Sequence, residues 1–281
     1  MLMTLYTFSS FAAPNSKNRA PERQGWDDAL PLYGKVKALS IIHHTAAEVE
    51  TGEHTKKRSG KSICDYRFNR KGNVTDEVFY NDDGSVDVRN HYKYGARRLL
   101  TEKIIHDSNN AVQERVLYKY DPRRRVTERI WCNSDYTPKR KCEHKYGKRG
   151  RETERVMYNS KGAVIEKHLY KYDSKGRKSE KDIYNSRGAL HEKELYKYDK
   201  EANLTEKIIL NGKGVQLEKE LYKYDKDKHM VQLSNYNRRG KLAARLRYKY
   251  DAKGNLVEIT SSKEGRTPPI GIIEFRINYR R

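Results

Sequence analysis

The chain consists of short runs rich in Tyr, Thr, Ile, Leu and Val that alternate with polar turns. The runs are about seven and ten residues long, which is a strand length, and none has the length or the 3.6-residue spacing of a helix. The turns begin with Asp or Asn and mostly end three residues later with Gly, as in 173–176 and 185–188. Such residues suit a type I turn that closes with a glycine bulge. The pattern predicts an all-β chain of antiparallel β-hairpins.

These hairpins repeat with a fixed interval of 26 residues and no insertion. The aromatic residue that opens each unit is Tyr66, Tyr92, Tyr118, Tyr170, Tyr196, Tyr222 or Tyr248, and His144 takes its place once. Eight units, each of two strands, therefore span residues 66–262. We expect this repeat array to form one long twisted or spiralling meander sheet.

Positions within a unit are numbered here from that opening aromatic residue. Side chains alternate across a strand, and the bulged turn predicts that odd positions share one face of the sheet. The odd face would carry the tyrosines at positions 1 and 3 and the acids at position 11. The even face would carry the bases at positions 2, 12 and 24. A turn without the bulge would instead mix Glu with Lys on both faces.

The charge of the chain makes the even face a candidate binding surface. The formal net charge is +22, with 60 Lys and Arg against 38 Asp and Glu. Evenly spaced bases attract polyanions, although they equally keep a flat sheet soluble and its edges free. The polyanion-binding candidates are Lys93, Lys119, Lys145, Lys171, Lys197, Lys223 and Lys249 at position 2, with Lys167, Lys193 and Lys219 at position 24.

The tyrosine face offers two interpretations. Rows of rings can stack on sugars, or they can replace a core in a chain that is only 35% hydrophobic. The residues concerned, as glycan-stacking or sheet-core candidates, are Tyr172, Tyr198, Tyr224 and Tyr250.

Nothing in the sequence indicates catalysis. The histidines are scattered without zinc-ligand spacing, and no P-loop, G-x-S-x-G or H-E-x-x-H motif is present. We expect no enzyme activity, no metal and no cofactor. The three cysteines are too few for a disulfide framework, and a bridge between Cys132 and Cys142 is left open.

The ends of the chain differ from the repeats. Residues 1–12 are apolar and are interpreted as a truncated signal peptide, which predicts a periplasmic, cell-surface or secreted protein. Residues 13–32 have the composition of a linker, and 33–65 of an N-terminal β cap. Residues 263–281 are expected to supply a closing strand. No segment has the length of a membrane span.

The words "YKYDSKGRKSEK", "YKYDKEANLTEK" and "YKYDAKGNLVEI" resemble the YD repeat of the bacterial Rhs-type family. The resemblance implies sheets of hairpins that can wind into a spiral, and binding to carbohydrates or surfaces. No toxin-sized segment follows the repeats, so the chain resembles a stand-alone repeat protein of this type.

Together these features predict a non-enzymatic binding or structural module. The expected partner is a surface glycan or another anionic polymer such as an anionic polysaccharide. The alternatives are a nucleic-acid-binding protein that uses the basic face, and a structural scaffold of the cell envelope.

Overall fold

The fold comes from a computed structural model of the 281-residue chain. The described residues are 32–44, 46–48, 54–56, 61–262 and 271–280. The predicted signal peptide, nearly all of the predicted linker and part of the C-terminal segment lie outside these residues.

The chain is almost entirely β-strand, as expected. The strands are β1 (Val36–His44), β2 (Ala46–Glu48), β3 (His54–Lys56), β4 (Lys61–Phe68), β5 (Val74–Tyr80), β6 (Val86–Tyr94), β7 (Leu100–His106), β8 (Val112–Tyr120), β9 (Val126–Cys132), β10 (Pro138–Tyr146), β11 (Glu152–Asn159), β12 (Val164–Tyr172), β13 (Lys178–Asn185), β14 (Leu190–Tyr198), β15 (Leu204–Asn211), β16 (Gln216–Tyr224), β17 (Met230–Tyr236), β18 (Leu242–Tyr250), β19 (Leu256–Ser262) and β20 (Gly271–Tyr279). One 3₁₀ turn, Ala96–Arg98, lies between β6 and β7. Of the helices in this described part, none is long and apolar enough to cross a membrane.

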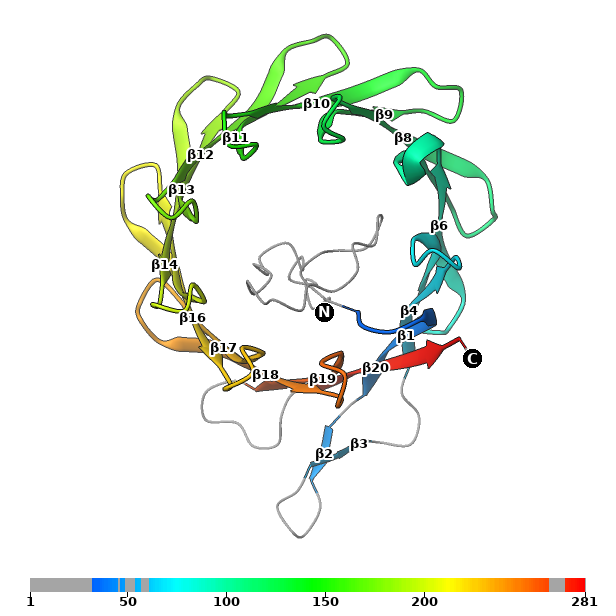
Figure 1. The fold of residues 1–281 in the computed structure, drawn as a ribbon, viewed down its shortest axis with the longest axis vertical. Coiled ribbons are helices and arrows are strands. Elements are labelled where there is room, and N and C mark those ends of the chain that lie inside the picture. The colour runs from blue at the N-terminus through cyan, green and yellow to red at the C-terminus, as the bar shows by residue number, and fades with distance from the viewer. Residues whose placement is uncertain (1–31, 45, 49–53, 57–60, 263–270, 281) are drawn as a thin grey trace.

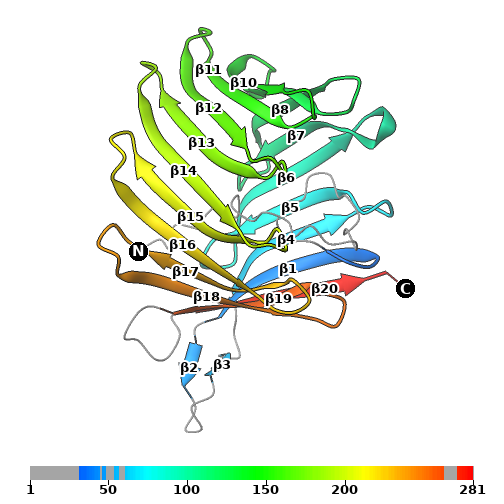
Figure 2. The ribbon, with the colours of Figure 1, turned by 60° about the vertical axis from the view of Figure 1, so that its left-hand side comes forward.

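The main sheet closes on itself. From β4 to β20 each strand pairs antiparallel with the next, and β1 pairs with both β4 and β20. The result is an 18-stranded barrel, seen end-on in Figure 1. Figure 2 shows the strands running obliquely, as closure of a barrel requires. Strands β2 and β3 form a separate two-stranded sheet.

The expected open or spiralling meander is therefore wrong, although the antiparallel hairpins are confirmed. The repeat pattern determines how each strand pairs with its neighbours. Because this local pairing is the same in an open sheet and in a closed barrel, the pattern does not distinguish the two. Closure depends on β1, which lies before the repeats, and on β20, which follows them; together they fill the gap between β4 and β19. It removes the two free edges that an open sheet would expose.

The turns are divided between the two ends of the barrel because successive strands run in opposite directions. One end, called the basic end below, carries the turns 69–72, 95–98, 121–124, 147–150, 173–176, 199–202, 225–228 and 251–254. The other, called the opposite end, carries the turns 81–84, 107–110, 133–136, 159–162, 185–188, 211–214 and 237–240.

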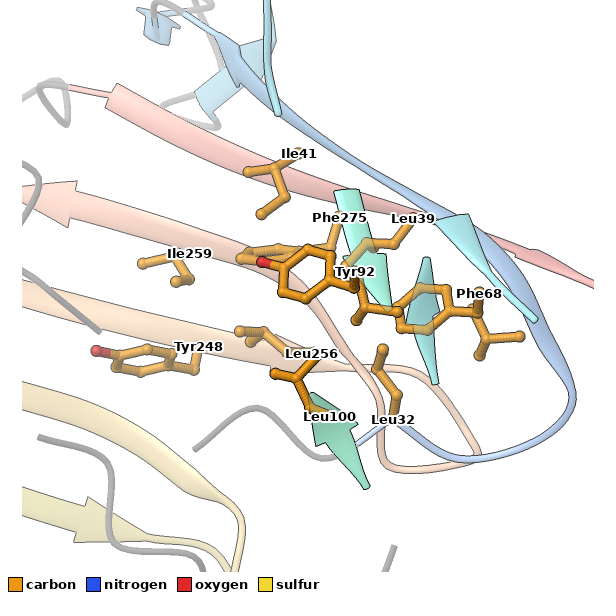
Figure 3. Close-up of a cluster of buried hydrophobic side chains, with 12 residues drawn as sticks. Leu32, Leu39, Ile41, Phe68, Tyr92, Leu100, Tyr248, Leu256, Ile259 and Phe275 are labelled. Carbon is orange, nitrogen blue, oxygen red and sulfur yellow. The ribbon is translucent and has the colours of Figure 1, made fainter. Parts of the chain in front are cut away.

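The largest core cluster lies against the inner wall around β1. The described chain starts inside the ring in Figure 1, and its first residue, Leu32, is buried in this cluster. Figure 3 shows Leu32 with Phe68, Leu100 and Leu256 among its members. Tyr92 of β6 and Tyr248 of β18 join the same cluster from either side of β1. The tyrosines at position 1 therefore face the inside of the barrel.

Candidate anion-binding end of the barrel

The register of the hairpins decides which charges share a face. Lys171 pairs with Glu180 and Tyr170 with Lys181, and the register shifts between Lys171 and Tyr172. This irregularity is additional to the glycine turn, so it reverses the parity expected for the second strand of each hairpin. The prediction that acids at position 11 lie on the tyrosine face is wrong. They lie with the bases of positions 2 and 24 on the outer face.

On that outer face most glutamates at position 11 bind bases from both sides. The Glu180 carboxylate lies 2.6 Å from the Lys171 ammonium and 2.6 Å from that of Lys193. Hydrogen bonds from these two lysines lower the pKa of Glu180 to about 2. The same pairing recurs around the ring as Lys93–Glu102–Arg115, Lys119–Glu128–Lys141, Lys145–Glu154–Lys167 and Lys197–Glu206–Lys219, and as Lys249–Glu258.

The candidate lysines thus form a ring around the outside of the barrel, close to the basic end. Those at position 2 are well exposed, with 63% of the Lys171 side chain accessible and 71% of that of Lys249. Lys223 faces Gln232 instead of a glutamate. Most of these groups hold two bases for one acid, but a second acid joins some of them, as Asp182 does 2.8 Å from the Lys193 ammonium.

The candidate tyrosines lie on the inner face, where the hydroxyls of three of them donate hydrogen bonds to backbone carbonyls of the barrel. The hydroxyl of Tyr172 donates to the Glu152 carbonyl over 2.6 Å, and that of Tyr198 donates to the Lys178 carbonyl over 2.9 Å. Tyr250 makes the corresponding bond to Met230. Burial raises the pKa of Tyr198 and of Tyr224 to about 12. These contacts favour the sheet-core interpretation of the four tyrosines.

Charges on the inner face are also compensated. Glu194 accepts a hydrogen bond from Tyr196 and lies 2.9 Å from the Lys181 ammonium and 3.5 Å from that of Lys207. Several Lys and Arg side chains also lie over tyrosine rings in cation–π contacts, for example Arg177 at 4.7 Å from the Tyr198 ring centre. The charges of this part of the inner wall are therefore compensated.

One unit departs from the repeat and places unusual groups on the inner wall. His144 replaces the tyrosine of position 1, and its Nδ1 lies 2.6 Å from Oε1 of Glu152. Arg155 donates two hydrogen bonds to the same carboxylate, over 3.0 and 2.9 Å. The Sγ atom of Cys142 is 3.6 Å from His144 Nε2.

This Cys142–His144–Glu152 row has the order of a nucleophile, a base and an orienting acid. Its environment argues against that use, because Cys142 is 2% exposed and burial raises the pKa of its thiol. Cys142, His144 and Glu152 therefore contact one another as structural side chains of the inner wall. Among the described residues no group of three or more His, Cys, Asp or Glu side chains is placed to hold a metal ion.

The least compensated charge lies in the turns of the basic end. The segments 66–73, 92–99, 118–125 and 144–151 hold fourteen Lys and Arg residues and a single acid, Asp121. Most of the turn bases are exposed: Arg70, Lys71, Arg97, Arg98, Arg123, Arg124, Lys148 and Arg149.

The same sector of the wall has the reverse charge at its opposite end. The turns 81–84, 107–110 and 133–136 contain four aspartates and no base. The sector from β4 to β11 is thus electrically polarised along the barrel. Sequence reasoning missed this feature because it followed the strand positions, although the basic turns of the first four units are visible in the printed sequence.

The turn side chains also touch the wall beside them. Arg125 lies 2.5 Å from an Asp121 carboxylate oxygen and stacks over the Tyr146 ring at 4.4 Å. In the next unit Gly147 takes the place of that aspartate. Arg151 stacks over the Tyr172 ring at 5.6 Å and has no carboxylate within ion-pair distance in the described part of the chain. The charge of this arginine is therefore available to an external anion.

Comparison with known proteins gives no established family. A family model described only as "Uncharacterised protein" matches residues 166–254. No curated protein matches the chain. The resemblance to the YD-repeat family is therefore not upheld.

Several solved structures are similar to the chain at a distance. A porin-like protein from Bacteroides uniformis has 8% identity over 88% of this chain and 100% of its own, with a TM-score of 0.46. A porin-like protein from Bacteroides vulgatus has 11% identity over 88% and 99%, with a TM-score of 0.36. The TcdB2-TccC3-Cdc42 structure has 11% identity over 79% and 16%, with a TM-score of 0.24. Similarities of this level say nothing about ligand or activity.

Proposed function

We propose that the protein is a non-enzymatic binding protein for an anionic polymer, such as an acidic surface glycan, which it engages with the basic end of the barrel. We also propose that it acts in the cell envelope or outside the cell.

The observation that carries this proposal is the concentration of unpaired positive charge at one end. The four adjacent turns 69–72, 95–98, 121–124 and 147–150 hold eight bases, none in an ion pair with a described residue, against one acid, and the same sector is acidic at its far end. Ion pairs explain most charges on the strands, but they do not explain this excess. Charge spread over several turns favours a long ligand, because many weak contacts act together.

The outer wall supports the same interpretation. The exposed lysine ring at position 2 lies directly before the turns and extends the positive surface around the barrel. The large apolar side chains that are exposed among the described residues are few: Tyr136, Val164, Ile165 and Val215. A charged outer wall favours contact with water and with polar polymers.

The test compares two variants that remove equal charge from the two ends. In the first, Arg70, Lys71, Lys148 and Arg149 are changed to Gln. In the second, Lys161, Arg187, Lys213 and Arg238, which are exposed at the opposite end, are changed to Gln. Affinity for immobilised heparin and for single-stranded DNA is measured at two salt concentrations.

We expect the parent to bind heparin with a steep salt dependence, since each contact displaces counterions. The basic-end variant should lose on the order of a hundredfold in affinity, and the opposite-end variant should bind almost as the parent does. Equal losses in both variants would mean that only net charge matters. Tighter binding of DNA than of heparin would favour a nucleic-acid partner.

A further inference from the structure

The last residue of each turn has a left-handed backbone conformation, which glycine adopts without strain. At the basic end Gly72, Gly150, Gly176 and Gly254 meet this requirement. The other four turns place a residue with a side chain there: Arg98 (φ 62°), Arg124 (φ 64°), Ala202 (φ 69°) and Lys228 (φ 67°). Three of these four residues are basic. An L-residue in this conformation destabilises the fold relative to glycine.

The turn that ends at Arg124 has the backbone hydrogen bond of the glycine turns, whereas the turn that ends at Arg98 keeps this bond at 3.3 Å and has a second left-handed residue, Arg97 (φ 61°). The Arg124 amide donates to the Asp121 carbonyl over 2.9 Å, as the Gly176 amide does to the Asp173 carbonyl over 2.8 Å. The arginine side chains therefore contribute nothing to the turn that glycine would not also allow.

Nor do these side chains have another role within the fold. Arg98 and Arg124 are exposed, and neither guanidinium takes part in an ion pair or a side-chain hydrogen bond with any described residue. They lie in adjacent units, roughly 10 Å apart along the wall if two strands separate them. Both belong to the sector with the fewest acids.

We propose that Arg98 and Arg124 are ligand-contacting residues of the basic end, retained at a cost in stability because they bind the oxyanion groups of the polymer. This inference rests on the proposed function. A guanidinium offers two parallel donors to a carboxylate or a sulfate, which an ammonium cannot do. The proposal therefore assigns a ligand whose carboxylates or sulfates are presented in series.

The experiment compares three variants with the parent for heparin affinity and melting temperature. The first, R98G/R124G, removes both side chains and both strained conformations. The second, A202G, relieves the same strain at the same turn position without removing a charge. The third, R98K/R124K, keeps the charge and removes the forked donors.

For R98G/R124G we expect a melting temperature raised by about 2–4 °C per site and a heparin affinity lowered on the order of tenfold, with a smaller salt dependence. The A202G variant should melt higher than the parent by a similar amount per site and bind equally well. The R98K/R124K variant should bind more weakly than the parent and melt at the same temperature.

Two outcomes would overturn the inference and leave the proposed function standing. One is a parent that binds heparin and an R98G/R124G variant that binds it equally well. The other is an A202G variant that loses as much affinity, since turn flexibility would then explain the effect. A parent that binds no polyanion would overturn the proposed function and this inference together.

Discussion

The ammonium of Lys171 lies 2.6 Å from the Glu180 carboxylate, between two paired residues of adjacent strands on the outer face of the barrel. The same contact recurs at Lys119, Lys197 and Lys249, so the lysine of every Tyr-Lys-Tyr-Asp word except the one at Lys223 has an acidic partner in its own hairpin. The partner explains part of the repeated pattern without any ligand. The turns, where such partners are missing, are therefore the better place to look for binding.

The energetic value of this pair can be measured by removing each partner. Because 63% of the Lys171 side chain is exposed, K171Q should lower the free energy of unfolding only slightly. E180Q should cost more, about 1 kcal/mol, since Lys171 and Lys193 both lose a partner. Urea unfolding measures both variants. K223Q is the control, because Lys223 faces Gln232 and should change nothing.

Stability should depend on acid pH through Glu152. Its hydrogen bonds to His144 and Arg155 overcome the effect of burial and lower its pKa from 4.5 to about 2. A depressed pKa in the folded state contributes stability above pH 4.5, which is lost as the pH falls toward 2. Urea unfolding of the parent should therefore weaken over this range.

An E152Q variant provides the comparison. It should be less stable at pH 7 by on the order of 2–3 kcal/mol, and the difference from the parent should shrink as the pH falls. A difference that stays constant between pH 7 and pH 2.5 would show that the charge of Glu152 does not stabilise the barrel.

The hydrogen bonds of the inner tyrosines should be measurable one at a time. Y172F removes the hydroxyl that donates to the Glu152 carbonyl and should cost about 1 kcal/mol. Tyr224 occupies the same position two units later and has no hydroxyl bond to any described residue, so Y224F should be nearly neutral. The melting temperatures of both variants measure the contribution of the hydroxyl bond. Equal effects would mean that ring packing, and not the bond, holds these residues.

All three cysteines should behave as buried thiols. Cys64, Cys132 and Cys142 are free, and each is 2% exposed or less. Iodoacetamide should therefore label them slowly in the folded protein and completely in urea, as mass spectrometry can count. A Cys132–Cys142 disulfide in the purified protein would contradict the structure, in which burial raises the pKa of both thiols.

Local sequence signals predicted the hairpins and the turns well. The spacing of Asp173 and Gly176 places a turn where the backbone bonds of the structure have one. The partner of Lys171 could not be predicted in the same way. It depends on a second irregularity beside the turn, which no residue type marks, and a shift of one residue moves a side chain to the other face.

Closure of the barrel was unpredictable for a different reason. It requires Ile41 of β1 to lie between Cys64 of β4 and Phe275 of β20, residues that are far apart in the sequence. Periodicity describes neighbours along the chain and carries no information on whether the ends meet. The candidate site was only partly visible, because the basic turns are legible in the sequence but their gathering at one end requires the alternating strand directions.

Because the barrel wall is built from repeated hairpins, its diameter depends on the number of repeat units. Every unit contributes two strands that contact only their neighbours, while β20 and β1, which lie outside the repeats, join β19 to β4. Loss or gain of one 26-residue unit would change the wall by two antiparallel strands and leave β1 and β20 in place to close the ring. The circumference would then change in increments of one hairpin, and the number of basic turns would change with it. A change in the number of units would in this way change the length of polymer that one molecule binds, with the same type of contact at each turn.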